Sequence, residues 1–104
     1  MQKDAEVEKF LKEYEHPMQA EIQILRQIIL DLSLNIREGV KWNSMSFQTS
    51  EWFATFNKRE TTRIEFVLHL GAKVRALMVI RDAADLEVKR VAVTALMTEW
   101  IRNV

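Results

Sequence analysis

Hydrophobic residues recur every three or four positions through the first third of the chain, which predicts two helices. Side chains with this spacing fall on one face of a helix. The first stripe consists of Val7, Phe10, Leu11 and Tyr14. The second stripe consists of Met18, Ile22, Leu25, Ile29 and Leu32. We expect the His16-Pro17 pair to end the first helix, because a residue before proline avoids the helical conformation.

After Leu34 the pattern changes to short runs of β-branched and aromatic residues, which indicate strands. These runs cover residues 40–42, 52–56, 64–70 and 77–80, with polar or glycine-bearing connections at 43–50, 57–62 and 71–76. Asp82 and Asp85 are candidate caps for a last helix. Its expected apolar face consists of Val93, Leu96, Met97, Trp100, Ile101 and Val104.

The order of these elements predicts the α+β class. We expect two N-terminal helices and a C-terminal helix packed on an antiparallel sheet of three to five strands, since short connections favour antiparallel pairing. The 104 residues, of which 48% are hydrophobic, suit one domain spanning 1–104. Within the strand at 64–70, alternation places Ile64, Phe66 and Leu68 toward the helices and His69 on the other face.

Charge and composition exclude several classes of function. Basic and acidic residues number 15 each, and there is no cysteine, so thiolate metal sites and a cysteine nucleophile are ruled out. Residues 41–81 nevertheless carry a net charge of +4. The basic residues are scattered, and no nucleic-acid partner is expected. No 18-residue apolar run and no secretion signal are visible, so we expect a cytoplasmic protein without a membrane partner.

Several blocks of the sequence resemble the YdhG-like bacterial domains of unknown function. The blocks are Val7–Leu11, Val40-Lys41-Trp42-Asn43, Ser46-Phe47, Phe53–Asn57, Leu68-His69-Leu70-Gly71-Ala72-Lys73 and Ile80-Arg81-Asp82. The resemblance implies a frataxin-like fold, and one branch of the family is described as an iron chaperone. Two departures stand out: Met45 occupies the place of a family proline, and the segment after Lys73 is shorter. No catalytic residue carries over.

An aromatic and basic group is the first candidate for a binding site. It consists of Lys41, Trp42, Asn43, Phe47, His69 and Lys73. Aromatic walls with a few polar groups are typical of small-molecule pockets, and the lysines and the histidine would favour a small anionic ligand. The alternative interpretation is that the aromatic rings belong to the core and the lysines are solvated.

A metal site is the second candidate. Asp4, Glu8 and Glu15 lie near one stripe of the first helix, where a frataxin-like iron-handling protein would bind Fe²⁺. A solvated helix face with charges of both signs explains the same residues. Apart from this Fe²⁺ alternative, no cofactor is expected.

No nucleophile elbow, Walker loop or dinucleotide motif is present, and the sequence favours a non-enzymatic function. A protein-interaction module without a ligand is a third interpretation.

The second face of the sheet is expected to be covered by protein, either by another copy of the chain or by the C-terminal helix. It combines Glu65, Val67 and His69 with one side of the strand at 77–80. An apolar centre with a polar rim is typical of an interface, and a two-fold contact is the commonest arrangement. The sequence therefore predicts a homodimer through this face.

Overall fold

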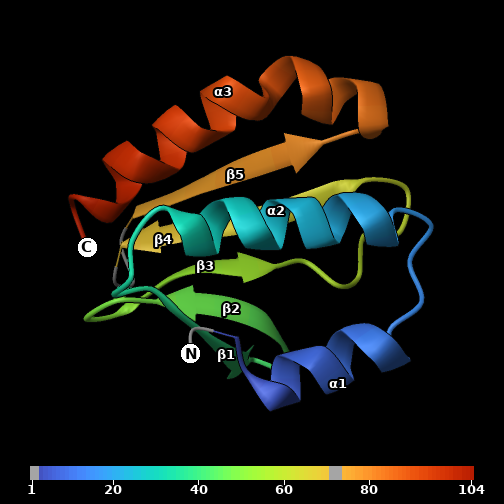
Figure 1. Ribbon diagram of the computed structural model, residues 1–104, viewed down its shortest axis with the longest axis horizontal. Helices are drawn as coiled ribbons and strands as arrows, with labels where there is room; N and C mark the ends of the chain where they lie inside the picture. The colour runs from blue at the N-terminus through green and yellow to red at the C-terminus, as the bar shows by residue number, and fades with distance from the viewer. Residues whose placement is uncertain (1–2, 71–73) are drawn as a thin grey trace.

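The predicted α+β fold is confirmed by the computed structural model, which describes residues 3–70 and 74–104 (Figure 1). The elements in chain order are α1 (Ala5–Glu13), α2 (Gln19–Asp31), β1 (Arg37–Lys41), β2 (Ser44–Gln48), β3 (Trp52–Phe56), β4 (Ile64–Leu70), β5 (Val74–Ile80) and α3 (Ala83–Ile101). None of these helices is long and apolar enough to span a bilayer.

The five strands form one antiparallel sheet in the order β1-β2-β3-β4-β5, so each strand pairs with its neighbour in sequence. One expectation was wrong: the segment 43–50 is not a connection, because β2 occupies most of it. Lys41 pairs with Ser44, which leaves a turn of only two residues, Trp42 and Asn43. The last strand also begins earlier than expected, at Val74.

The helices pack on one face of the sheet. In Figure 1, α2 lies over the sheet, α3 runs beside β5, and α1 lies near β1 and β2. Residue distances confirm the contacts of α1 with β1 and β2, of α3 with β5, and of α2 with α3. Aspartates begin two of the helices: Asp4 accepts hydrogen bonds from the N–H groups of Glu6 and Val7, and Asp82 accepts one from Asp85. Such caps satisfy N–H groups that have no partner within the helix.

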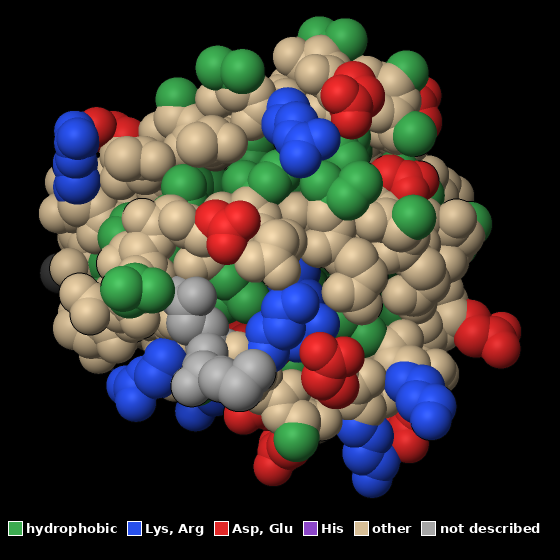
Figure 2. Space-filling view, in the orientation of Figure 1, with side chains coloured by type: hydrophobic (Ala, Val, Ile, Leu, Met, Phe, Trp, Pro, Cys, Tyr) green, Lys and Arg blue, Asp and Glu red, His purple; other side chains and the backbone are tan. Residues whose placement is uncertain are grey.

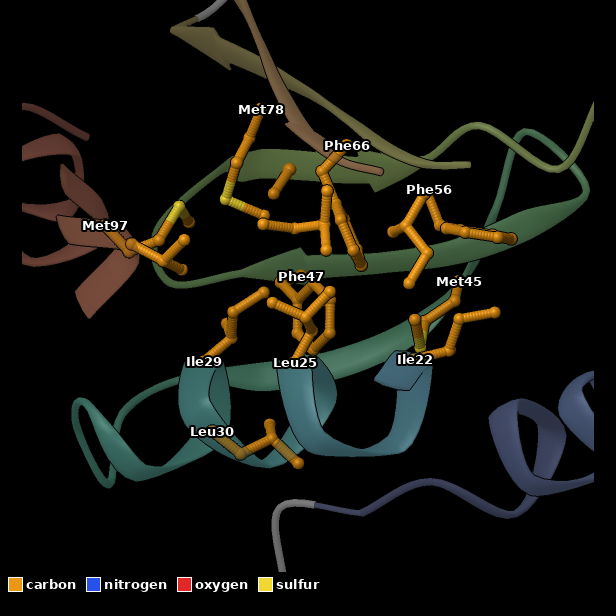
Figure 3. Close-up of a cluster of buried hydrophobic side chains, with 14 of the residues drawn as sticks. Ile22, Leu25, Ile29, Leu30, Met45, Phe47, Phe56, Phe66, Met78 and Met97 are labelled. Atoms are coloured by element: carbon orange, nitrogen blue, oxygen red, sulfur yellow. The ribbon is translucent and has the colours of Figure 1, made fainter. Parts of the chain in front are cut away.

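The core lies between α2, α3 and the sheet (Figure 3). In Figure 3, Ile22, Leu25 and Ile29 of α2 point toward the sheet, with Leu25 next to Phe47 and Ile22 next to Met45. Phe66 joins this layer, with its ring centre 6.1 Å from that of Phe47. Leu86, Val93 and Met97 are the buried residues of α3, whereas Leu96, expected on the apolar face, is 42% exposed.

The strand pairing assigns side chains to the two faces of the sheet. Phe47 pairs with Ala54, which pairs with Leu68, and all three are buried on the helix-facing side. Ser46 pairs with Thr55, which pairs with Val67, and these side chains form the open face. In the edge strand β5, Met78 is buried toward the helices. Leu77, paired with Val67, belongs to the open face and is 52% exposed.

Candidate functional site

The β1–β2 turn has an unusual backbone for the residues that form it. Trp42 has φ 54° and Asn43 has φ 60°, so both adopt the left-handed conformation. A two-residue hairpin of this kind prefers Asn-Gly or Gly-Gly, since a bulky side chain is strained there. Trp42 is nevertheless 59% exposed, so core packing does not account for its large ring.

The ring of Trp42 contacts groups from two different strands. Its centre lies 5.4 Å from that of the His69 imidazole, and the two planes meet edge to face at 84°. The ammonium group of Lys41 lies 5.5 Å from the Trp42 ring centre, within the range of a cation–π interaction. The open face thus carries an exposed aromatic ring beside an imidazole and a cation.

Hydroxyl groups connect His69 to the centre of the sheet. The Nε2 atom of His69 lies 3.3 Å from Thr55 Oγ1, and Thr55 Oγ1 lies 3.1 Å from Ser46 Oγ. Ser44 Oγ donates to the carbonyl of Phe56 at 2.6 Å. The contacts of Thr55 with His69 and with Ser46 connect the His69 ring on β4 to β3 and β2. We call Trp42, His69, Thr55 and Ser46, together with Lys41, the Trp42 cluster.

Two further groups occupy the open face on either side of the Trp42 cluster. The Trp52 ring lies over Gly39, where an added Cβ atom would be 2.9 Å from Trp52 Cη2. Glu65 is buried, and its carboxylate accepts from Arg63 at 2.7 Å and from Asn57 at 3.1 Å. The open face is therefore a mixed surface in which polar groups already have partners.

The structure brings together three of the six residues predicted for the ligand site. Lys41, Trp42 and His69 are in contact, and Asn43 is exposed in the same turn. Phe47 lies on the opposite, helix-facing side and is fully buried, because alternation along β2 turns it away from Ser46. Lys73 lies outside the described residues.

The hydroxyl groups of the Trp42 cluster were not predicted from the sequence. The sequence feature that could have predicted them is the alternation of Ser44 and Ser46 with Met45 and Phe47, which is typical of a strand with one polar face. This arrangement does not form a nucleophile. Ser46 is fully buried, and Thr55 separates its oxygen from His69.

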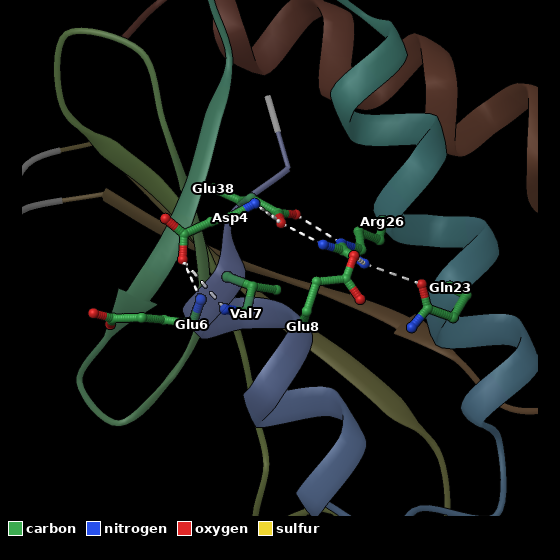
Figure 4. Close-up of polar contacts among 7 residues, drawn as sticks. All are labelled: Asp4, Glu6, Val7, Glu8, Gln23, Arg26 and Glu38. Carbon is green, nitrogen blue, oxygen red and sulfur yellow. Dashed lines mark hydrogen bonds and ion pairs between the residues drawn. The ribbon is translucent and has the colours of Figure 1, made fainter. Parts of the chain in front are cut away.

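The acidic residues of the metal alternative have other contacts (Figure 4). Asp4 caps α1, and Glu8 lies 3.0 Å from the guanidinium of Arg26. Glu15 is exposed beyond the end of α1 at Glu13. In the ranges 3–70 and 74–104, no three acidic or histidine side chains converge as ligands of a metal ion would.

A buried ion pair, also missed from the sequence, connects α2 to β1. Arg26 Nε donates to Glu38 Oε1 at 2.7 Å, and Arg26 Nη2 to Glu38 Oε2 at 2.5 Å (Figure 4). The backbone N–H of Asp4 donates to the same carboxylate at 2.8 Å. Hydrogen bonding to Glu38 raises the pKa of Arg26 above its ordinary value. The pair therefore holds α1, α2 and β1 together.

The other histidine, His16, has a structural position. Its Nδ1 accepts from the N–H of Met18 at 3.0 Å, and its Nε2 lies 3.2 Å from the carbonyl of Glu60. Nearby, the Tyr14 hydroxyl donates to the carbonyl of Lys58 at 2.5 Å. Burial, reinforced by the charge of Glu60, raises the pKa of Tyr14. These contacts attach the α1–α2 corner to the β3–β4 connection.

A shallow groove lies between α1 and α2, away from the Trp42 cluster. It is lined by Glu8, Lys9, Leu11, Lys12, Glu13, Gln19 and Gln23. Acidic and basic side chains alternate along it, as on a solvated helix face. We assign no ligand to this groove.

Comparisons with known proteins do not place the chain in a family. No family model, no curated protein and no solved structure matches it.

Proposed function

We propose that this protein is a non-enzymatic binding protein and that its ligand site is the Trp42 cluster. The proposed ligand is a small molecule bearing a carboxylate or phosphate group. It would contact the exposed ring of Trp42 with its apolar part and approach Lys41 and His69 with its anionic part.

The proposal rests on the backbone conformation and exposure of Trp42. A bulky aromatic residue at φ 54° is strained by about 1–3 kcal/mol. The 59% exposure of its side chain shows that burial compensates little of this strain. Strained and exposed residues of this kind cluster at ligand sites, where the protein holds a side chain ready for contact.

The surrounding groups favour an anion. The Lys41 ammonium and the His69 imidazole both lie beside the Trp42 ring, and the segment 41–81 has a net charge of +4. Hydrogen bonds to charged groups are stronger than those between neutral groups. A carboxylate or phosphate should therefore bind here more tightly than a neutral ligand of the same shape.

A place among the YdhG-like domains, with a frataxin-like fold and a cytoplasmic location, remains part of the proposal. The order of two helices, five antiparallel strands and a helix supports it. The iron-handling alternative of that family would use Asp4, Glu8 and Glu15. The roles of Asp4 as a helix cap and Glu8 as an ion-pair partner favour the anion site instead.

The test is a titration of the folded protein with inorganic phosphate, succinate and Fe²⁺, each followed by thermal melting and tryptophan fluorescence. A ligand that binds only the folded state raises the melting midpoint. We expect phosphate or succinate to raise it in the wild type. The rise should be lost in Trp42→Phe and in His69→Gln.

Trp52→Phe is the matched control, because it removes an indole from the same face but outside the Trp42 cluster. It should retain the response to the anion. A response that survives Trp42→Phe and His69→Gln would contradict the assigned site. A response to Fe²⁺ alone would replace this proposal with the iron-handling one.

A second copy on the open face is the competing proposal, since Leu77 is 52% exposed there. Leu77→Lys would abolish such a dimer. A dimer that dissociates with this substitution, together with no response to either anion, would favour an interaction module.

A further inference from the structure

His16 lies at the corner between α1 and α2, and both nitrogens of its ring contact backbone groups. The residue is 6% exposed. Its Nδ1 atom lies 3.0 Å from the backbone nitrogen of Met18, and its Nε2 atom lies 3.2 Å from the carbonyl oxygen of Glu60 and 3.3 Å from that of Arg63. His16 therefore joins the start of α2 to the connection between β3 and β4.

The corner and the β3–β4 connection lie at the same end of the molecule in Figure 1. Figure 2, in the same orientation, shows no histidine among the described side chains of this face, as expected for a buried ring. The other histidine, His69, belongs to the Trp42 cluster on the open face of the sheet. The corner is therefore a separate feature of the fold, and the proposed ligand site does not depend on it.

The partners of His16 determine where its ring carries a proton. A backbone N–H group donates, and a carbonyl oxygen accepts. The Nδ1 atom therefore presents a lone pair to Met18, and Nε2 carries the hydrogen that points to Glu60 and Arg63. This form of the ring is neutral. A second proton, on Nδ1, would point at the N–H of Met18, so a hydrogen bond would be replaced by two opposed donors.

Charges of both signs surround the corner, and several already have partners. The carboxylate of Glu60 accepts from the backbone and hydroxyl of Thr62. The guanidinium of Arg63 pairs with Glu65. The first turn of α2 presents the positive end of the helix dipole. The remaining titratable side chains of the corner, of this first turn and of the connection are Tyr14, Glu15, Glu21, Lys58 and Arg59. The hydrogen bond to Nδ1 is thus the contact that distinguishes the neutral ring from the charged one.

We propose that His16 is a pH-dependent switch: its neutral ring holds the α1–α2 corner against the β3–β4 connection, and its protonation separates them. Separation removes the donor to the carbonyl oxygens of Glu60 and Arg63 and the acceptor of the Met18 N–H. The hydroxyl of Tyr14, which donates to the same connection, keeps its proton throughout, because burial raises the pKa of Tyr14. The opening is therefore confined to the His16 end of the corner.

The direction of the pH effect follows from the number of protons bound. A histidine in contact with water takes up a proton at about pH 6.5. The open corner takes up this proton, and the closed corner does not while Nδ1 accepts from Met18. The open form therefore gains as the pH falls. At pH 5 the ratio of open to closed corners should exceed its value at pH 8 by up to about 30-fold, because each unit below about pH 6.5 contributes a factor of about ten.

The test is a titration of the isotope-labelled full chain from pH 8 to pH 5, followed by nuclear magnetic resonance. At pH 8 we expect His16 to carry its hydrogen on Nε2. As the pH falls, the His16 ring, the amide of Met18 and the carbonyl carbons of Glu60 and Arg63 should change with one midpoint. The chain has two histidines, so His69→Gln leaves one imidazole to titrate and should give the same changes.

His16→Asn is the matched variant. Asparagine does not titrate, and its side-chain oxygen can still accept from the N–H of Met18. The signals of Met18 and of the Glu60 and Arg63 carbonyls should then stay unchanged between pH 8 and pH 5. If this variant does not fold, His16→Gln takes its place, because the glutamine amide can still donate to the carbonyl of Glu60.

The titration can contradict the switch in several ways. The proposal fails if Nδ1 of His16 carries a hydrogen at pH 8, or if the ring stays neutral down to pH 5. It also fails if the ring titrates without a change at Met18 and the two carbonyls, or if His16→Asn shows the same changes as the wild type. None of these outcomes depends on the response to phosphate or succinate.

Discussion

At the scale of single residues, the β1–β2 turn combines backbone strain with exposed side chains. Asn43 occupies the second turn position at φ 60°, where glycine is strongly preferred. Its exposed side chain was predicted to bind the ligand. A substitution by glycine separates the contribution of Asn43 to the turn from a contribution to binding. Glycine still adopts the turn conformation but has no side chain that could contact a ligand.

Asn43→Gly should raise the free energy of unfolding by a few tenths of a kcal/mol to about 1 kcal/mol, since glycine adopts positive φ without strain. Asn43→Ala should lower it, because alanine lacks both the freedom of glycine and the local hydrogen bonds of asparagine. Urea denaturation measures both. If Asn43→Gly also removes the response to phosphate or succinate, Asn43 contacts the ligand. An unchanged response would show that Asn43 contributes to the turn and not to binding.

The buried Arg26–Glu38 pair is the second feature at this scale. Arg26→Met should destabilise the fold by about 3–5 kcal/mol, because it leaves the Glu38 carboxylate buried without its partner. The double variant Arg26→Met, Glu38→Leu should recover much of this loss, although the N–H of Asp4 then lacks its acceptor. Urea denaturation of the wild type, Arg26→Met, Glu38→Leu and the double variant gives the coupling free energy between the two side chains. Additive losses would contradict the pairing.

At the scale of elements, the start of α3 depends on a carboxylate. The backbone N–H of Arg81 donates to Asp85 at 2.8 Å, and the Lys89 ammonium donates to it at 3.0 Å. These contacts lower the pKa of Asp85 below its ordinary value, and the hydrogen bond from the Arg81 backbone has the largest effect. A carboxylate with a lowered pKa stabilises the fold above its unfolded pKa of about 3.9, and this stability is lost as the pH falls through the folded pKa.

Asp85→Asn should therefore destabilise the protein at pH 7 and make less difference at pH 3, because the carboxyl of the unfolded wild-type chain is then largely protonated and part of the stability that the charge supplies is lost. Asparagine keeps an oxygen that can accept from Arg81, so the comparison isolates the charge. Urea midpoints at the two pH values measure the effect. An equal loss of stability at both would show that the charge of Asp85 is not responsible.

The contact between β1 and the start of β3 is also specific. Gly39→Ala should cost about 1–3 kcal/mol, because the added carbon would overlap the Trp52 ring. In a Trp52→Leu background the same change should cost less or become stabilising, since alanine restricts the unfolded chain. Thermal or urea unfolding of the wild type, the two single variants and the double variant measures the cost of Gly39→Ala in each background. If Gly39→Ala costs the same in both backgrounds, its cost does not come from overlap with the Trp52 ring.

At the scale of the whole molecule, the aliphatic and aromatic core between the helices and the sheet supplies the stability. Treatment with a strong chelator should leave the melting midpoint unchanged, because this core does not depend on bound metal. A protein that folds around a metal ion loses its structure on chelation. A fall of many degrees would make a metal ion part of the fold and would revive the Fe²⁺ alternative.

The elements with strong periodic patterns could be predicted from the sequence. The strand β4 has the bounds expected from alternation, and His69 lies on the face that alternation assigned. The strand β2 was missed because the turn before it contains Trp42 and Asn43 rather than glycine. Contacts such as His69 with Thr55, or Arg26 with Glu38, join separate elements. Local patterns do not contain that information, since it depends on how the elements pack.

The neighbour-to-neighbour order of the strands has a consequence for how the chain folds. Each β-pairing closes a short loop, and short loops lose little conformational entropy on closure. Folding rates rise as contacts become more local, so the sheet can grow rapidly by adding one hairpin at a time. The helix α1 is different, because its attachment through Asp4 to Glu38 spans 34 positions. We expect α1 to dock late during folding and to open first in native-state hydrogen exchange.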